Sequence, residues 1–165
     1  MKSSRFLKKA KENMGWMVTF ILIMIVAWYI SKFHYQLLMI QGNSMMPSFC
    51  HLQIVILEKR SEEFSYGDVI AFQCDGLDAM LVKRIVACPG DTVCIKEGTL
   101  CVNGVVSKVY GPDIFFEYVG IVEKELFLDE GQYFTIGDNV AESKDSRYEE
   151  IGIVENVNIR GKVIE

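Results

Sequence analysis

An uncharged apolar run near the N-terminus constrains this chain more than any other feature. Residues 14–30 contain no charged side chain over seventeen positions, which is close to the shortest length that spans a bilayer core of about 30 Å. Trp16 stands near one end of the run, and Trp28 and Tyr29 stand near the other, as aromatic side chains at membrane interfaces do. We therefore predict a membrane-spanning helix over residues 14–31.

Two other interpretations of this run fit less well. A cleaved signal peptide would have a shorter apolar core followed by small residues at a cleavage site, and the residues after Ile30 read Ser-Lys-Phe-His-Tyr-Gln, without a small-x-small pattern. A buried core helix would carry polar residues at helical spacing, and only Thr19 offers one. A retained anchor is the interpretation that we carry forward.

Charge is distributed unevenly around this anchor. Residues 1–14 have a net charge of +4, so the remainder carries −9 of the overall −5. Because basic residues tend to stay on the cytoplasmic side of a membrane, we predict a basic cytoplasmic head at residues 1–13 and an extracytoplasmic domain at residues 32–165. The acidic body excludes a nucleic-acid partner, because binding to phosphates needs a basic face on the folded part.

Beyond the anchor, the sequence changes to short alternating runs that are typical of β-strands. Turn signals such as Pro89-Gly90 and Asn103-Gly104 separate the runs, and no long amphipathic helix is evident. We predict a mainly β protein, with a coiled antiparallel β-sheet domain preceded by one N-terminal transmembrane helix. The predicted strands cover residues 37–40, 53–57, 68–72, 79–86, 91–95, 99–102, 132–136 and 158–163.

Five cysteines lie beyond the anchor, and an odd number cannot all pair in disulfides. A two-residue turn at Glu97-Gly98 would place Cys94 opposite Cys101 in a hydrogen-bonded pair, whose spacing suits a disulfide less well than the closer pair type. A cross-strand disulfide and two free thiols both stay open. The cysteines and the two histidines show no metal-binding spacing, so we expect no metal and no cofactor.

Three segments stand out as candidates for chemistry. Residues 42–48 read Gly-Asn-Ser-Met-Met-Pro-Ser, and residues 83–91 read Lys-Arg-Ile-Val-Ala-Cys-Pro-Gly-Asp. The third segment runs from Gly-Asp-Asn at residues 137–139 to Ser-Lys-Asp-Ser-Arg at residues 143–147. Taken singly, each has an ordinary interpretation: a turn serine, a lysine that blunts an edge strand, and a surface ion pair.

Together and in this order, the three segments resemble the type I signal peptidases, which are membrane-anchored serine proteases with a Ser–Lys dyad. Residues 66–72 add a weaker match, and the short chain with one anchor is similar to the Gram-positive branch. The chain departs from the family pattern at Ser48, where threonine is usual, and at Ala87, where glycine is usual. In the family a glycine normally follows the arginine closely, whereas here residues 149–151 stand before Gly152.

The resemblance implies Ser44 as the nucleophile and Lys83 as the general base. A serine hydroxyl needs a base to remove its proton. A lysine can serve only as a neutral amine, so its pKa must fall from about 10.4, and burial has that effect. The resemblance further implies that Ser143 forms a hydrogen bond with the Lys83 amine and orients it.

The other supporting residues follow from the same resemblance. Asp145 and Arg147 would form an ion pair behind the dyad, and Asp138 would help to hold the same loop. An oxyanion formed during acyl transfer needs hydrogen-bond donors, and the backbone N–H of Ser44 is the expected one. Gly42 stands where some members have a helping serine, so help at that position would come from the backbone.

The resemblance implies an endopeptidase of the bacterial cell membrane that removes signal peptides from exported preproteins after a small-x-small motif. The substrate would lie as an added strand in a groove between residues 37–40 and 81–86. The partners are then preproteins and the lipid bilayer, with secretion machinery or pilin subunits as further candidates. Met45, Met46 and Phe49 are either core residues or part of a lipid-facing surface.

Three points stay open. A signal-peptidase-like assembly factor dedicated to a pilus system is an alternative, although the presence of both Ser44 and Lys83 favours an enzyme. A self-cleaving Ser–Lys repressor-type protease fits less well, because the chain has an anchor and no DNA-binding helical half. Residues 105–131 form either a short extra lobe or a loop over the groove.

Overall fold

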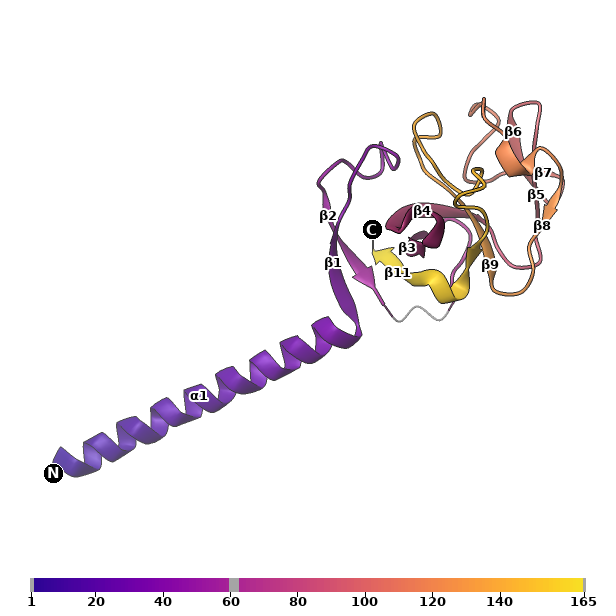
Figure 1. Ribbon diagram of the computed structural model, residues 1–165. Helices are drawn as coiled ribbons and strands as arrows, with labels where there is room; N and C mark the ends of the chain where they lie inside the picture. Colours follow the sequence, from indigo (N-terminus) through magenta and orange to yellow (C-terminus); the bar gives the residue numbers. More distant parts are fainter. Residues whose placement is uncertain (1, 60–62, 165) are drawn as a thin grey trace. The chain divides into compact units, whose positions relative to one another are not determined.

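The computed structural model describes residues 2–59 and 63–164, with side chains from residue 14 onward. The chain divides into two units, Met1–Gln36 and Leu37–Glu165 (Figure 1).

The first unit is built around the helix α1, Lys2–Phe33. Its segment Met14–Phe33 is the one helix, within the part of the chain that the structure describes, that is long and apolar enough to cross a membrane. The Thr19 Oγ1 atom donates a hydrogen bond to the Gly15 carbonyl at 3.0 Å, so this hydroxyl is satisfied inside the helix, as a lipid environment requires. The helix begins well before residue 14, so the basic head is helical too.

A seven-stranded sheet forms the larger part of the second unit (Figure 1). The pairings recorded between its strands are antiparallel, which agrees with the predicted fold class. In spatial order the strands are β1 (Tyr35–Met39), β2 (Ile54–Glu58), β11 (Ile159–Ile164), β3 (Val69–Cys74), β4 (Ala79–Ala87), β9 (Gln132–Ile136) and β10 (Val154–Glu155).

Both faces of this sheet are covered, which explains the unbroken apolar run in β3. Val69 and Ala71 pack into one hydrophobic cluster, together with residues of the β1–β2 loop. Ile70 and Phe72, which alternate with them, pack into a second cluster on the other face. A strand that is buried on both faces has no polar side to present, so it loses the usual polar alternation.

A second, smaller sheet has the strand order β7 (Val105–Val106), β6 (Thr99–Val102), β5 (Thr92–Lys96) and β8 (Leu126–Phe127). The hairpin between β5 and β6 turns at Glu97 and Gly98, which both have positive φ, 52° and 75°. Two successive residues with positive φ are typical of the type I′ turn that joins two-residue hairpins. Cys94 therefore lies opposite Cys101 in the antiparallel ladder, in the predicted register.

Residues 105–131 belong to this smaller sheet and its core. They carry β7, β8 and the short 3₁₀ turn η2 (Gly120–Val122). Tyr110, Phe116 and Val122 are buried in the same cluster as Phe134 of β9. The segment is thus a small lobe, which is one of the two alternatives that the sequence left open.

All eight predicted strands are present, with boundaries within two residues of the predicted ones. The strands that sequence patterns missed, β7, β8 and β10, each contain two residues. An alternating pattern cannot be recognised over two positions, and tertiary pairing alone makes these residues strands.

Candidate active site

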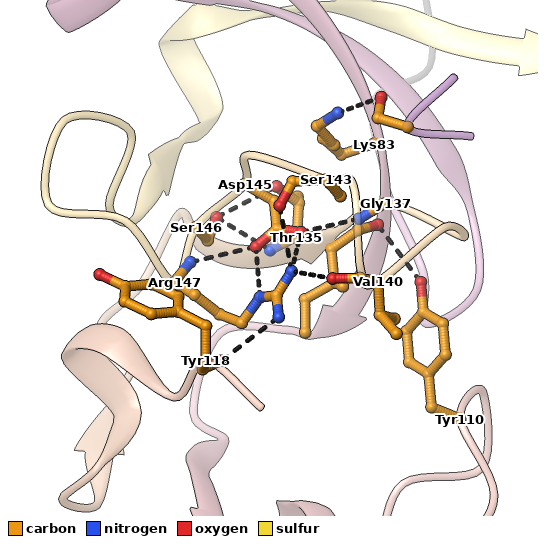
Figure 2. Close-up of polar contacts among 12 residues, drawn as sticks. Lys83, Tyr110, Tyr118, Thr135, Gly137, Val140, Ser143, Asp145, Ser146 and Arg147 are labelled. Atoms are coloured by element: carbon orange, nitrogen blue, oxygen red, sulfur yellow. Dashed lines mark hydrogen bonds and ion pairs between the residues drawn. The ribbon is translucent and has the colours of Figure 1, made fainter. Parts of the chain in front are cut away.

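The loop between β1 and β2 brings Ser44 to the side chain of Lys83 in β4. The Lys83 Nζ atom donates a hydrogen bond to the Ser44 Oγ atom at 2.6 Å, and a dashed line marks this contact (Figure 2). A neutral amine would accept the serine proton over the same distance. Lys83 is only 3% exposed, so this contact is largely shielded from water.

The place of Lys83 within β4 explains why its amine is buried. Leu81 and Ile85 lie on the same face of the strand, two residues away on either side, and pack into the hydrophobic cluster. Burial disfavours the ammonium form and lowers the pKa of Lys83 to about 8. The Asp145 carboxylate raises this pKa, and the Arg147 guanidinium lowers it again.

Asp145 and Arg147 form a buried ion pair with two parallel hydrogen bonds. Arg147 Nε lies 2.8 Å from Asp145 Oδ1, and Arg147 Nη2 lies 2.9 Å from Asp145 Oδ2. Arg147 also donates to the Val140 carbonyl at 2.9 Å and to the Tyr118 carbonyl at 3.3 Å (Figure 2). Asp145 Oδ2 accepts from the Gly137 N–H at 3.2 Å. The pair therefore organises the loop that follows β9 at residues 137–147.

Asp138 pairs with Arg84, a residue to which the sequence pattern assigned no role. Arg84 Nε and Nη2 each donate to one carboxylate oxygen of Asp138, both at 2.8 Å. Arg84 Nη1 also donates to the Gly67 carbonyl at 2.8 Å, which ties the weaker matching segment to the same loop. Burial would raise the pKa of Asp138, but the hydrogen bonds from Arg84 and Ser48 outweigh it and hold that pKa below its usual value.

The predicted hydrogen bond between Ser143 and the Lys83 amine is not made in this structure. Ser143 is 2% exposed, and its Oγ atom has no hydrogen-bond partner among residues 2–59 and 63–164. The Lys83 amine is directed at Ser44 instead. Ser143 Oγ lies against Gly137, where a Cβ atom would collide with both Ser143 Oγ and the Ser44 carbonyl oxygen. Ser143 is therefore directly behind the Ser44 loop, within reach of the site but unpaired.

Two residues that the sequence did not single out hold the Ser44 loop. Asn139 donates from its backbone N–H to the Ser44 carbonyl at 3.0 Å and from Nδ2 to the Asn43 carbonyl at 3.3 Å. His51 Nδ1 accepts a hydrogen bond from the Gly42 N–H at 2.9 Å. The Gly42 N–H is thus already engaged and is not free to bind an oxyanion, contrary to the role considered for it.

A groove of about 350 Å³ opens beside Ser44 and Lys83. β3 pairs with β4 along residues 79–84, but β9 pairs with β4 only from Arg84 onward. The other edge of residues 79–83 therefore has no strand partner in the described part of the chain. The groove is lined by Leu38, Met39, Ile40, Gln41, Ser44, Met45, Ala79, Met80, Leu81, Val82 and Lys83.

The residues that line the groove agree with the predicted range for one wall and differ from the predicted range for the other. The wall at residues 38–41 overlaps the predicted 37–40, while the β4 wall runs over residues 79–83 instead of 81–86. Met45 and Phe49 are 1% and 5% exposed and belong to the core, whereas Met46 is 39% exposed. Of the two alternatives for these apolar residues, the core alternative holds for Met45 and Phe49.

The cysteines lie outside this site. All five are free thiols, and none of them lines the groove. Over the described ranges 2–59 and 63–164, no three His, Cys, Asp or Glu side chains gather in a way that could hold a metal ion.

Comparison with known proteins identifies a family to which this chain is similar. Residues 13–165 match the family model described as signal peptidase, peptidase S26. The chain is 29% identical over 173 residues to signal peptidase I of Bacillus licheniformis, covering 98% of this chain and 91% of that protein. It is 28% identical to signal peptidase IB of Staphylococcus aureus, covering 93% of this chain and 88% of that protein.

A crystal structure of a signal peptidase I from Enterococcus faecalis V583 aligns with 63% of this chain and 98% of that chain, at 27% identity and a TM-score of 0.48. The family match extends over nearly the whole chain, from the anchor to the last strand. This protein therefore belongs to the signal peptidase family, peptidase S26.

Proposed function

We propose that this protein is a serine endopeptidase that removes signal peptides from exported preproteins, with Ser44 as the nucleophile and Lys83 as the general base. The observation that carries the proposal is the 2.6 Å contact between a buried amine and a hydroxyl, at the wall of a groove with an unpaired strand edge. Family membership supports the substrate class, because the relatives named above are themselves signal peptidases.

In the proposed reaction, the neutral Lys83 amine takes the proton of Ser44 Oγ as this oxygen attacks the scissile carbonyl. The resulting ammonium then protonates the leaving amine, which leaves an acyl-enzyme at Ser44. Lys83, neutral again, activates a water molecule that releases the signal peptide. A pKa of about 8 suits both directions of transfer, because the group changes protonation state near neutral pH.

The tetrahedral intermediates carry a negative oxygen that needs hydrogen-bond donors. The Ser44 N–H has no acceptor among the residues that the structure describes, which supports a role for it as one such donor. Asn139 fixes the peptide group that follows, through the Ser44 carbonyl. This contact would hold the Ser44 backbone in place while charge develops on the substrate.

The substrate would bind by strand addition to the unpaired edge of β4 at residues 79–83. Main-chain hydrogen bonds would provide affinity there, and alternate side chains would point into the groove. Leu38, Met45 and Leu81 make parts of the groove wall apolar, which fits the small apolar side chains of a small-x-small cleavage motif.

A membrane location is supported by the helix and by the strands that follow it. Met14–Phe33 is long and apolar enough to cross a bilayer, and the basic head before it fits the cytoplasmic side. Leu37 of β1 and Ile54 of β2 are 71% and 65% exposed, and exposed apolar side chains of this kind are suited to contact with lipid. We propose a single-pass protein with its β domain on the outer side.

The pilus-dedicated assembly factor is not favoured. The relatives that match most of this chain are named signal peptidases. A non-catalytic role would also leave unexplained why a lysine is buried against a serine, since burial of an ammonium group is costly.

The test is cleavage of a preprotein with an Ala-x-Ala site by the full chain in proteoliposomes, with the cut mapped by mass spectrometry. We expect Ser44→Ala and Lys83→Met each to lower the cleavage rate by about a thousand-fold or more. Ser65→Ala and Lys96→Met, which lie outside the groove, serve as matched controls and should retain activity. Cleavage at the wild-type rate by Lys83→Met would refute the proposal.

A further inference from the structure

The β5–β6 hairpin holds two thiols directly opposite each other. Cys94 and Cys101 are Cα partners in the antiparallel ladder. Their side chains lie on the face opposite Val93 and Leu100, which are fully buried in the hydrophobic core. Because directly opposed residues share a face, the two Cβ atoms point to the same side of the sheet.

The register of this hairpin is fixed from both ends. At the tip, Glu97 and Gly98 supply the two positive φ angles of the turn, and the Phe116 N–H donates to the Gly98 carbonyl at 2.8 Å. At the base, the Asn103 N–H donates to the Thr92 carbonyl at 2.8 Å. A slip of one residue would break these contacts and move the core side chains to the other face, so the two cysteines stay opposed.

The separation expected for such a pair is compatible with a disulfide. The bond at the base makes Thr92 and Asn103 a hydrogen-bonded pair, and Cys94 and Cys101, two residues inward on each strand, are of the same type. Hydrogen-bonded pairs have Cα atoms about 5.5 Å apart. Disulfides join Cα atoms about 4.4–6.8 Å apart, so this Cα separation is suitable. The two Cβ atoms must approach from the spacing of about 4.5–5.5 Å in directly opposed pairs to the roughly 3.5–4.5 Å of a disulfide.

The two thiols differ in how accessible they are. Cys94 is 2% exposed, whereas Cys101 is half-buried. Burial raises the pKa of the Cys94 thiol, and the neighbouring Cys101 thiol contributes in the same direction. An external reagent would therefore reach Cys101 first.

We propose that Cys94 and Cys101 form a disulfide that closes the β5–β6 hairpin when the domain meets a disulfide-bearing oxidant. The Cys101 thiolate attacks one sulfur of the oxidant and releases its other half as a thiol, giving a mixed disulfide. The Cys94 thiolate then attacks the Cys101 sulfur and releases the second half. Two protein thiols are oxidised, and one external disulfide is reduced to two thiols.

The remaining cysteines have no such partner. Cys50 is exposed in the loop after Ser44, and Cys74 is buried, where its thiol contacts the Glu150 carbonyl at 3.6 Å. Burial raises the pKa of the Cys88 thiol to about 11, so it is a poor thiolate at neutral pH. Under this proposal, two of the five cysteines form a disulfide and the other three stay free thiols.

The proposed disulfide would stabilise the smaller sheet and would lie outside the groove beside Ser44 and Lys83. It closes a loop of only eight residues, so its effect on the unfolded chain is moderate. Neither cysteine lines the groove, and the proposal does not depend on the peptidase function.

The experiment uses the full chain in detergent micelles, as a Cys88→Ala variant, incubated with oxidised glutathione. Lys96 lies between the two cysteines, so trypsin separates them, and only a disulfide keeps peptides 85–96 and 97–108 together. We expect this joined pair in the non-reduced digest, with a mass two hydrogen atoms below the sum of the two peptides. We also expect a melting temperature higher by roughly 5–10 °C than after reduction. Cys101→Ala in the same background is the matched control and should show none of these changes.

Three results would overturn the proposal. One is glutathione that stays on Cys101 without transfer to Cys94. Another is a cross-link that joins either residue to Cys50 or Cys74 instead. The third is a chain whose two thiols both stay free in excess oxidised glutathione while Cys50, the exposed thiol, reacts.

Discussion

Replacing Lys83 by methionine is expected to abolish catalysis and, at neutral pH, to stabilise the folded domain. The reason is the cost of holding an ammonium group in a dry site. The structure lowers the pKa of Lys83 from 10.5 to about 8, with burial as the largest cause. Below pH 8 the amine is protonated in both the folded and the unfolded chain, so folding bears the full cost of burying the charge.

The magnitude follows from the pKa difference. Each pKa unit corresponds to about 1.36 kcal/mol, so the lowered pKa corresponds to about 3 kcal/mol of lost stability at pH 7. Methionine also removes the hydrogen bond that the Lys83 ammonium donates to Ser44 at pH 7, which is worth about 2 kcal/mol because the donor is charged. The free energy of unfolding of the Lys83→Met variant should therefore be about 1 kcal/mol higher than that of the wild type at pH 7.

The sign of the pH dependence makes this prediction specific. Between pH 8 and 10.5, the folded chain holds the neutral amine while the unfolded chain still binds the proton, so wild-type stability rises with pH. Above pH 10.5, both states are neutral and the cost is gone. The advantage of Lys83→Met should consequently shrink between pH 8 and 10.5 and vanish above it.

The assay is urea unfolding of the β domain within the full chain in micelles, measured at several pH values. Unfolding is followed by the near-ultraviolet circular dichroism of the tyrosine side chains. Lys96→Met, which removes an exposed amine paired with Glu125, is the matched control and should show no such pH dependence. The argument from desolvation fails if Lys83→Met is less stable than the wild type at pH 7. It also fails if their difference stays constant from pH 7 to pH 11.

Wild-type activity should report the same titration. With a pKa of about 8, about one tenth of Lys83 is neutral at pH 7 and about nine tenths at pH 9. The cleavage rate at saturating substrate should therefore rise about tenfold over this interval and level off above it. A rate that continues to rise in proportion to hydroxide beyond pH 9 would show that the amine keeps an ordinary pKa.

Other substitutions test the loops around the site. Gly137→Ala should lower kcat by at least about tenfold, because the added Cβ would collide with the backbone of the nucleophile loop; unchanged kcat would show that this loop can shift freely. Leu52→Gly should raise the free energy of unfolding in urea by roughly 0.5–1 kcal/mol, because Leu52 has a φ of 64°, which glycine adopts without steric cost. Leu52→Ala keeps a Cβ atom and should bring no gain. Asp145→Asn should cost roughly 3 kcal/mol of stability by leaving Arg147 buried without its partner. It should also move the pH–rate profile to lower pH, because Asp145 raises the pKa of Lys83; a shift to higher pH would contradict this assignment.

The elements of the fold were largely readable from local sequence patterns. The uncharged run predicted the membrane helix, and short apolar or alternating runs bounded by turn signals predicted the eight longer strands. The resemblance of three segments to a known family indicated Ser44 and Lys83, which lie 39 positions apart. Their proximity came from the family resemblance, since no local pattern connects residues at that separation.

The tertiary structure decided how the supporting residues are used. The sequence contains Arg84 and His51 without indicating that one binds Asp138 and that the other engages the Gly42 N–H. The family resemblance also suggested that Ser143 reaches the lysine amine, whereas that hydroxyl finds no partner among the described residues and lies against Gly137.

Sequence by itself therefore determined which segments form helix and strand and which residues are candidates for chemistry, because periodicity and residue type act over a few neighbouring positions. Only the tertiary structure decided which edge of β4 stays open and how far the pKa of Lys83 falls. Strand pairing and burial are set by segments far apart in the chain, and their effect appears only when those segments pack together.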